Sequence, residues 1–214
     1  MDKLQAKLIL NLTGSTSYYL WNGTEEYYKK LRKAYLDLKS TDHTEYLYFA
    51  FFTLSAATME YSLNYIIAEY CVSKFNPENY KRYCEEYIGL KFRSKLFMLP
   101  HIISEGKFSM NEEHHSFKLL EELITLRNRI LHNKEYLREF SLPLNGQLDS
   151  DVLTFPSKEN QINFELKIDT NFIDTLTKEK CLEFAVALGD FKELIMMPAL
   201  TNGLNENAML LKNY

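Results

Sequence analysis

Hydrophobic residues recur at helical spacing along most of the chain. In the segment 24–40, apolar side chains stand three or four residues apart at Tyr27, Leu31, Tyr35 and Leu38. A period of about 3.6 residues is typical of an amphipathic helix that buries one face. The same criterion predicts four more helices, over about 78–89, 90–104, 111–140 and 176–197.

The most apolar stretch of the chain, 44–74, is hydrophobic on nearly all sides. Its length raises the question of a membrane span, but Glu60, Asn64 and Glu69 interrupt it. A span needs about 18 or more successive apolar residues. A helix that is apolar all round is otherwise the central helix of a bundle. We therefore expect 44–74 to be that central helix, and we expect no membrane among the partners.

The segment 141–170 breaks the helical pattern. SLPLNGQLDSD, at 141–151, has the residues of turns, and VLTFPSKENQINFELKID, which follows it, holds two short β-like runs around a polar turn. These runs predict a small β-hairpin. The last fourteen residues, 201–214, show no period, and we expect them to be loosely held.

These patterns predict an all-α fold with one domain over 1–214. The domain would be an up-and-down helical bundle whose core is about 24–140 plus the helix 176–197, with the small β-hairpin as an insertion at about 141–170. The composition agrees, because 15 Tyr and 14 Phe against 7 Gly and 5 Pro favour long, aromatic-packed elements over a turn-rich all-β fold.

The net charge of −4 argues against a general nucleic-acid coat, since binding phosphates by charge needs a concentrated positive surface. It does not exclude a local positive surface. Basic residues gather in three clusters: Lys29, Lys30, Arg32 and Lys33; Lys91, Arg93 and Lys95; and Arg127, Arg129, Lys134 and Arg138. An ordinary solvated helix face is the alternative interpretation of the first two.

The motifs of metal and nucleotide enzymes are absent from the sequence. Cys71, Cys84 and Cys181 have no C-x-x-C spacing and are odd in number, so neither a zinc site nor a disulfide framework is indicated. No phosphate-cradling glycine loop, G-x-S-x-G elbow or H-E-x-x-H pair occurs. The neighbours His114 and His115 are interpreted as the solvated start of a helix. We expect no metal, no cofactor and a cytoplasmic protein.

The stretch LRNRILHNK, at 126–134, adds cationic and titratable groups to an otherwise amphipathic helix. Asn128 and His132 stand four residues apart and share one helix face, while Arg127 is offset by about 100° but has a long side chain. Imidazole transfers protons near neutral pH, and guanidinium binds phosphate and its transition-state charge. With an amide to orient them, these groups suffice to cleave RNA through its own 2′-hydroxyl.

The longer pattern, LLEELITL followed by Arg-Asn-x-x-x-His, resembles the signature of the HEPN family, named for nucleotide binding in higher eukaryotes and prokaryotes. That signature is an arginine, a polar residue directly after it, and a histidine separated from the arginine by four to six residues. Arg127, Asn128 and His132 match it position by position. The predicted helices from about 24 to 140 also resemble the family's bundle, so the resemblance covers about two-thirds of the chain.

The resemblance implies a homodimer that joins through its motif helices and brings two copies of Arg127 and His132 into one cleft. It implies a metal-independent endoribonuclease that acts on single-stranded RNA in a toxin or antiviral defence role, with a neutralising antitoxin as a further partner. His132 would be the general acid or base, Arg127 the phosphate clamp and Asn128 the orienting group. The product would carry a 2′,3′-cyclic phosphate.

Other members of the family are noncatalytic scaffolds, which supplies a second hypothesis. In it, the chain is a helical module that binds a partner protein or a nucleotide. The negative net charge and the many tyrosines motivate this alternative. The segment 141–170 departs from the simplest bundle under either hypothesis.

Glu60 is an auxiliary candidate, because a carboxylate in the middle of an apolar helix is costly unless it is paired. Two interpretations are open. Glu60 meets Arg127 or His132 across the bundle and fixes its orientation, or it lies on a partly wet edge of the helix.

Overall fold

The computed structural model describes residues 6–9, 18–40, 45–76, 79–131, 147–149, 152–154, 176–196 and 207–213. The helices in these ranges are α1 (Thr24–Ser40), α2 (Glu45–Lys74), α3 (Tyr80–Ile88), α4 (Phe92–Ile103), α5 (His115–Leu131) and α6 (Lys178–Met196). The strands are β1 (Ala6–Ile9), β2 (Tyr18–Trp21), β3 (Phe108–Met110), β4 (Gln147–Asp149), β5 (Val152–Thr154) and β6 (Leu210–Lys212).

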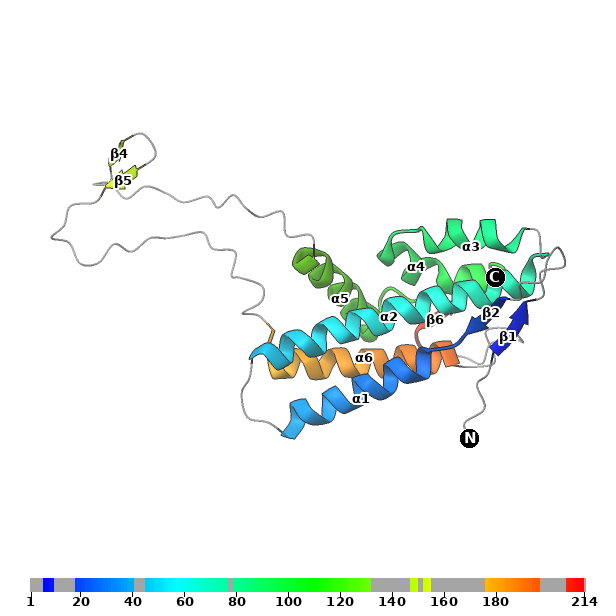
Figure 1. The fold of residues 1–214 in the computed structure, drawn as a ribbon, viewed down its shortest axis with the longest axis horizontal. Helices are drawn as coiled ribbons and strands as arrows, with labels where there is room; N and C mark the ends of the chain where they lie inside the picture. The colour runs from blue at the N-terminus through cyan, green and yellow to red at the C-terminus, as the bar shows by residue number, and fades with distance from the viewer. Residues whose placement is uncertain are drawn as a thin grey trace.

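α2 is the central helix of the bundle, as its apolar sequence predicts. It contacts each of the other five described helices. Figure 1 shows α1, α2 and α6 running side by side, with α3 and α4 along another side of α2 and α5 crossing it. The all-α fold class is therefore confirmed.

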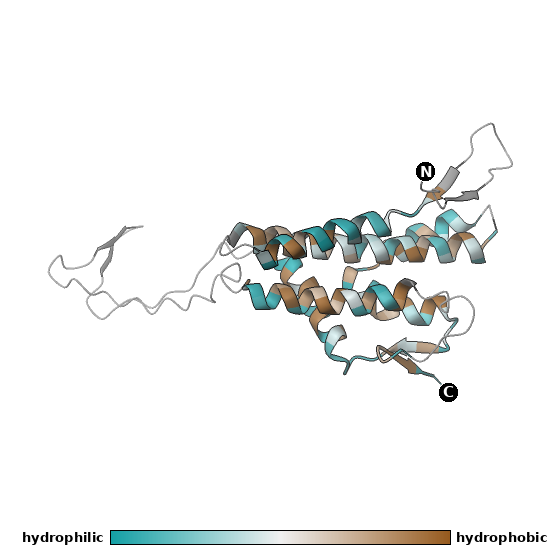
Figure 2. Cartoon of the chain, turned by 90° about the horizontal axis from the view of Figure 1, so that it is seen from below, coloured by the Kyte–Doolittle hydropathy of each residue, from teal (hydrophilic) through white to brown (hydrophobic). Residues whose placement is uncertain are grey.

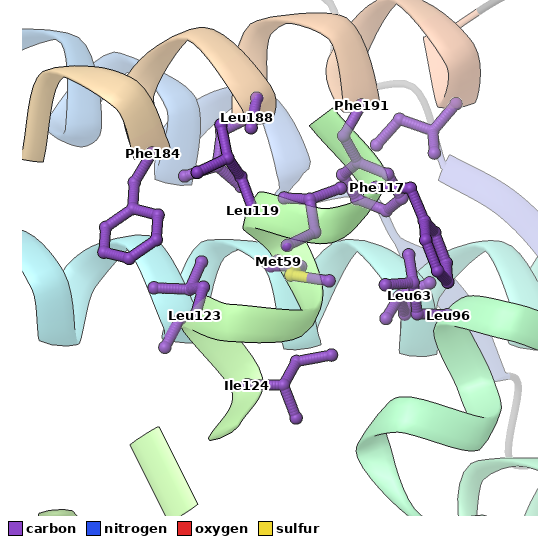
Figure 3. Packing of buried hydrophobic residues seen from close by; sticks show 14 of the residues in the cluster. Met59, Leu63, Leu96, Phe117, Leu119, Leu123, Ile124, Phe184, Leu188 and Phe191 are labelled. Atoms are coloured by element: carbon purple, nitrogen blue, oxygen red, sulfur yellow. The ribbon is translucent and has the colours of Figure 1, made fainter. Parts of the chain in front are cut away.

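The core forms where α2, α4, α5 and α6 meet. Figure 3 shows side chains from all four helices converging there, and those that are at most 5% exposed include Met59, Leu63, Leu96, Leu119, Leu123, Phe184, Leu188 and Phe191. Burying each large apolar side chain stabilises the fold by about 1.5–3 kcal/mol. Because Met59 and Leu63 flank Glu60 in sequence, and Leu123 precedes Arg127 by one turn, this packing also fixes where the polar residues lie.

Hydrophobic and hydrophilic residues are interleaved around the coil of the helices rather than separated along their length (Figure 2). This arrangement is that of amphipathic helices packed on a shared core. Among the helices in the described ranges, α2 included, none combines the length and the hydropathy that a membrane span requires.

The insertion at 141–170 contains a β-hairpin, as expected, but its strands differ from the prediction. β4 and β5 pair antiparallel, with Gln147 opposite Thr154 and Asp149 opposite Val152. The expected turn residues of 141–151 therefore include a strand, because a short strand next to a tight turn shares its composition. The second predicted run, at 162–168, lies outside the described residues.

Two further two-stranded sheets were not predicted. β1 pairs antiparallel with β2 ahead of the bundle, and β3 pairs antiparallel with β6, with Met110 opposite Leu210. The expectation of a loosely held C-terminal segment is wrong for 207–213. Met209 is buried there, and its carbonyl oxygen accepts a hydrogen bond from the backbone N–H of Asn111 at 2.8 Å.

Candidate functional site

The candidate site lies where three helices meet beside the core. The middle of α2, the first turn of α4 and the last turn of α5 supply its side chains, which are Glu60, Asn64, Phe92, Lys95, Arg127 and Asn128. Two of the three candidates from the motif, together with the auxiliary Glu60, are thus in one cluster.

Arg127 is held on two sides. Its Nη2 donates a hydrogen bond to Oε2 of Glu60 at 3.1 Å, and its Nη1 donates to Oδ1 of Asn128 at 3.0 Å. Its guanidinium carbon also lies 5.8 Å from the centre of the Phe92 ring, within the range of a cation–π contact. These contacts fix the plane of the guanidinium before any ligand arrives.

The pair of Arg127 and Glu60 confirms one of the two interpretations left open for Glu60, because its carboxylate does meet Arg127 across the bundle. The pair is not sealed from water, since the Arg127 side chain is 23% exposed and that of Glu60 is 32% exposed. Part of the Arg127 side chain is therefore in contact with solvent.

Lys95 is the unexpected member of the cluster. Its Nζ donates to Oδ1 of Asn64 at 2.8 Å and lies 3.7 Å from Oε1 of Glu60, so one carboxylate faces two cations. Burial lowers the pKa of Lys95, the Glu60 carboxylate opposes that shift, and the nearby charge of Arg127 adds to it.

The solvated-face interpretation of the second basic cluster is wrong for Lys95, whose side chain is only 4% exposed, although it holds for Lys91 and Arg93. The sequence does contain a pattern that indicates this burial. Lys95 shares the spacing of the buried residues Phe92, Leu96 and Leu99, which places it on the inner face of α4. A lysine on such a face needs a buried partner.

Asn64 was also missed as a site residue. It follows Glu60 by four residues on an apolar helix, so both side chains leave α2 on the same face. Because Asn64 accepts the hydrogen bond from Lys95, it connects α2 to α4 next to the carboxylate.

α5 is anchored so that its last turn presents Arg127 to α2. At its start, Nδ1 of His114 accepts a hydrogen bond from the backbone N–H of Ser116 at 3.2 Å, and the Ser116 hydroxyl donates to the carboxylate of Asp190 on α6. Further along, Nε of Arg93 on α4 contacts Oε1 of Glu121 at 2.5 Å. The histidine pair at 114–115 does mark the start of a helix, as interpreted from the sequence.

His132 lies outside the described residues, as do Lys134 and Arg138, since the description of this segment ends at Leu131. The placement of the predicted general acid or base therefore stays a prediction. The described part of the motif supplies the cation and the amide, and the histidine follows directly after the last described residue of α5.

Two surface hollows lie elsewhere on the described residues. One, of about 220 Å³, lies between α1 and α6 and is lined by residues including Tyr28, Tyr35 and Val186. Another, of about 500 Å³, is lined by residues including Tyr87 and His101. At the candidate site itself, the Arg127 side chain is 23% exposed and that of Glu60 is 32% exposed, whereas that of Lys95 is only 4% exposed.

Chemically, the cluster is a guanidinium held by a carboxylate and an amide, with a buried lysine behind the carboxylate. Guanidinium N–H groups are common hydrogen-bond donors to phosphate oxygens. Within the ranges that the structure describes, no three His, Cys, Asp or Glu side chains gather as a metal site would require.

Compared with models of known protein families, with curated proteins and with solved structures, the chain gives no match.

Proposed function

We propose that this protein is a metal-independent endoribonuclease of the HEPN type that cleaves single-stranded RNA through the 2′-hydroxyl. The observation that carries the proposal is the state of Arg127, the first residue of the Arg-Asn-x-x-x-His pattern. It is fixed by Glu60 and Asn128, yet it keeps an exposed side. A guanidinium that is both oriented and reachable is what a phosphate clamp requires.

In the proposed reaction, Arg127 binds a nonbridging oxygen of the scissile phosphate. His132 takes the proton of the 2′-hydroxyl, whose oxygen attacks phosphorus, and the P–O5′ bond breaks as the leaving oxygen gains a proton from water. The products are a 2′,3′-cyclic phosphate and a 5′-hydroxyl. Arg127 also stabilises the extra negative charge of the pentacoordinate transition state, where an oriented cation contributes most.

The proposal includes a homodimer, because a cleft made by two copies would enclose a site that one chain leaves partly open. The α2 face that carries Glu60 continues toward the start of the helix as an exposed row of apolar and small residues, namely Tyr46, Phe49, Ala50, Thr53 and Ala57. A second copy on this face would lie next to Arg127. In a cytoplasmic toxin or defence effector, an antitoxin would act by covering the same cleft.

The direct test is cleavage of a 5′-labelled single-stranded RNA by the purified protein in the presence of EDTA. We expect R127A and H132A to reduce the rate by at least about a hundredfold, the usual range for removing a phosphate clamp or a general acid–base group. Matched controls are R82A and H101A, which remove the same residue types from exposed positions on α3 and α4.

The chemistry of the product adds a second readout. A 2′,3′-cyclic phosphate resists phosphatase until acid opens it, so phosphatase should remove the terminal phosphate of the 5′ product only after acid treatment. Undiminished cleavage by H132A, or a product with a 3′-hydroxyl, would contradict the proposal.

The alternative function is a noncatalytic module that binds a partner protein or a nucleotide. It is favoured by the exposure of large aromatic residues, with Trp21 48%, Tyr83 42% and Phe97 38% exposed, since aromatic residues are enriched at protein interfaces. The same assay separates the two functions. No cleavage by the wild-type protein at high concentration, with or without EDTA, supports the module.

A further inference from the structure

We propose that Lys95 is a positioning residue of the Arg127 site. Lys95 supplies the positive charge that Glu60 does not neutralise, and in this way it prepares Arg127 to bind a phosphodiester. Lys95 does not touch the substrate in this proposal. That the ligand is RNA rests on the proposed function. The effect of Lys95 on anion binding can be measured without any cleavage.

The first step of the argument is the charge of the cluster. The contacts join two cations, Lys95 and Arg127, to one carboxylate, Glu60, so these three side chains sum to one positive charge. Without Lys95, the remaining pair would be neutral. An isolated neutral pair attracts a phosphate far less than a pair with an unneutralised cation beside it.

The second step is how Glu60 divides its two oxygens. Oε2 accepts from Arg127, while Oε1 faces Lys95. Arg127 therefore meets Glu60 through one nitrogen, and its second described hydrogen bond goes to Asn128. A carboxylate that was free to turn toward Arg127 could accept from two of its nitrogens at once and occupy the donors that a phosphate needs.

The third step is burial. The Lys95 side chain is 4% exposed, while that of Arg127 is 23% exposed. The extra positive charge therefore comes from a buried group, while the more exposed Arg127 is the cation that a ligand in solution can contact. A buried ion pair stabilises a fold no better than apolar residues of similar volume do, so fold stability alone does not explain a lysine at this position.

The test compares K95M, K95Q and K95R with wild type, and K91M is the matched control because Lys91 is an exposed lysine next to α4. Binding is measured by fluorescence anisotropy with a single-stranded 2′-deoxy oligonucleotide, which has no 2′-hydroxyl and cannot be cleaved by the proposed mechanism. Stability is measured in parallel by urea denaturation.

We expect K95M and K95Q to bind about tenfold more weakly, the scale of one unit charge acting over about 12 Å at an effective dielectric constant of about 20. K95R keeps the charge and should bind like wild type, as should K91M. K95M should be less stable than wild type, because it removes one partner of the buried cluster and the hydrogen bond to Asn64, and the parallel urea denaturation shows whether it still folds. K95Q covers the case in which K95M does not fold, because its amide can still hydrogen-bond to Asn64.

The outcomes keep the two proposals apart. Unchanged binding by folded K95M or K95Q overturns the role of Lys95 even if the wild-type protein cleaves RNA. Weaker binding by K95Q, rescued in K95R, supports that role even if no variant cleaves RNA, in which case only the ribonuclease proposal fails. When cleavage is observed, kcat/KM should fall in K95Q and recover in K95R.

Discussion

The three cysteines differ in how readily they ionise. Cys71 and Cys181 are fully buried, whereas Cys84 is half-buried on α3. A hydrogen bond from the Cys71 thiol lowers the pKa of Cys84 to about 7, while the same bond and burial raise the pKa of Cys71. Burial raises the pKa of Cys181 to about 12. Cys84 is therefore the cysteine whose partial exposure and lowered pKa both favour reaction of its thiol.

We therefore expect iodoacetamide to modify Cys84 first in the native protein. Because a lowered pKa means that the thiolate forms as the pH passes through about 7, the labelling rate should rise between about pH 6 and pH 8. Peptide mapping by mass spectrometry identifies the modified thiol, and C84S should abolish the fast phase. Earlier modification of Cys181, or no rise in rate below about pH 9, would contradict this expectation.

At the scale of single residues, the sequence predicted those site members whose chemistry conflicts with their surroundings. Glu60 was found because a carboxylate on an apolar helix needs a partner, and the Arg127 contact supplies it. Lys95 was missed because lysines on short helices are usually solvated, and only its register with Leu96 and Leu99 indicated burial. The packing of the helices decides which cation faces which carboxylate. A short stretch of sequence does not specify that packing.

Among the helices, α3 is the least anchored. It has no buried residue, and it is held to the bundle by partly buried side chains such as Tyr87 and Ile88 and by the stacking of Tyr83 on Phe75, whose ring centres are 4.0 Å apart. Elements with few buried apolar contacts open at low free energy.

Hydrogen exchange should therefore distinguish α3 from the helices of the core. We expect the amides of α3 to exchange at least tenfold faster than those in the middle of α2, which carry buried residues such as Met59 and Leu63. Exchange followed by mass spectrometry of peptides from each helix measures this difference. The middle of α2 is the internal reference, and equal protection of both helices would show that α3 is not a separate unit of low stability.

The helices were predicted closely and the strands were not, for a physical reason. The segment 24–40 coincides with α1, and 44–74 differs from α2 by one residue, because long helices repeat an apolar period several times. β3 and β6 have three residues each and lie about a hundred residues apart in sequence. A strand that short has no period, and its pairing is decided by where the folded bundle brings both segments together.

At the scale of the whole molecule, the distribution of charge matters more than its sum. The chain carries a net charge of −4, yet the described side chains around Arg127 carry a local excess of positive charge. Such a protein would attract RNA weakly over most of its surface and hold it at one place. The proposed dimer strengthens this contrast, because it would place two such sites in one cleft.

The dimer can be tested on the α2 face beside the site. Phe49 is 37% exposed on the row of residues that leads to Glu60, and a charge there would be desolvated in the proposed interface. F49D should therefore convert a two-copy particle into single chains in sedimentation velocity and should lower RNA cleavage with it, while the unfolding midpoint in urea at low protein concentration stays near that of the wild type.

L36D is the matched control, because Leu36 is an exposed apolar residue on α1, away from Glu60 and Arg127. It should leave both the two-copy particle and cleavage intact. If F49D separates the copies and cleavage persists, each chain carries a complete site and the shared cleft is wrong. If L36D separates them and F49D does not, the copies meet through α1. RNA would then bind at Arg127 on a face that the second copy does not cover.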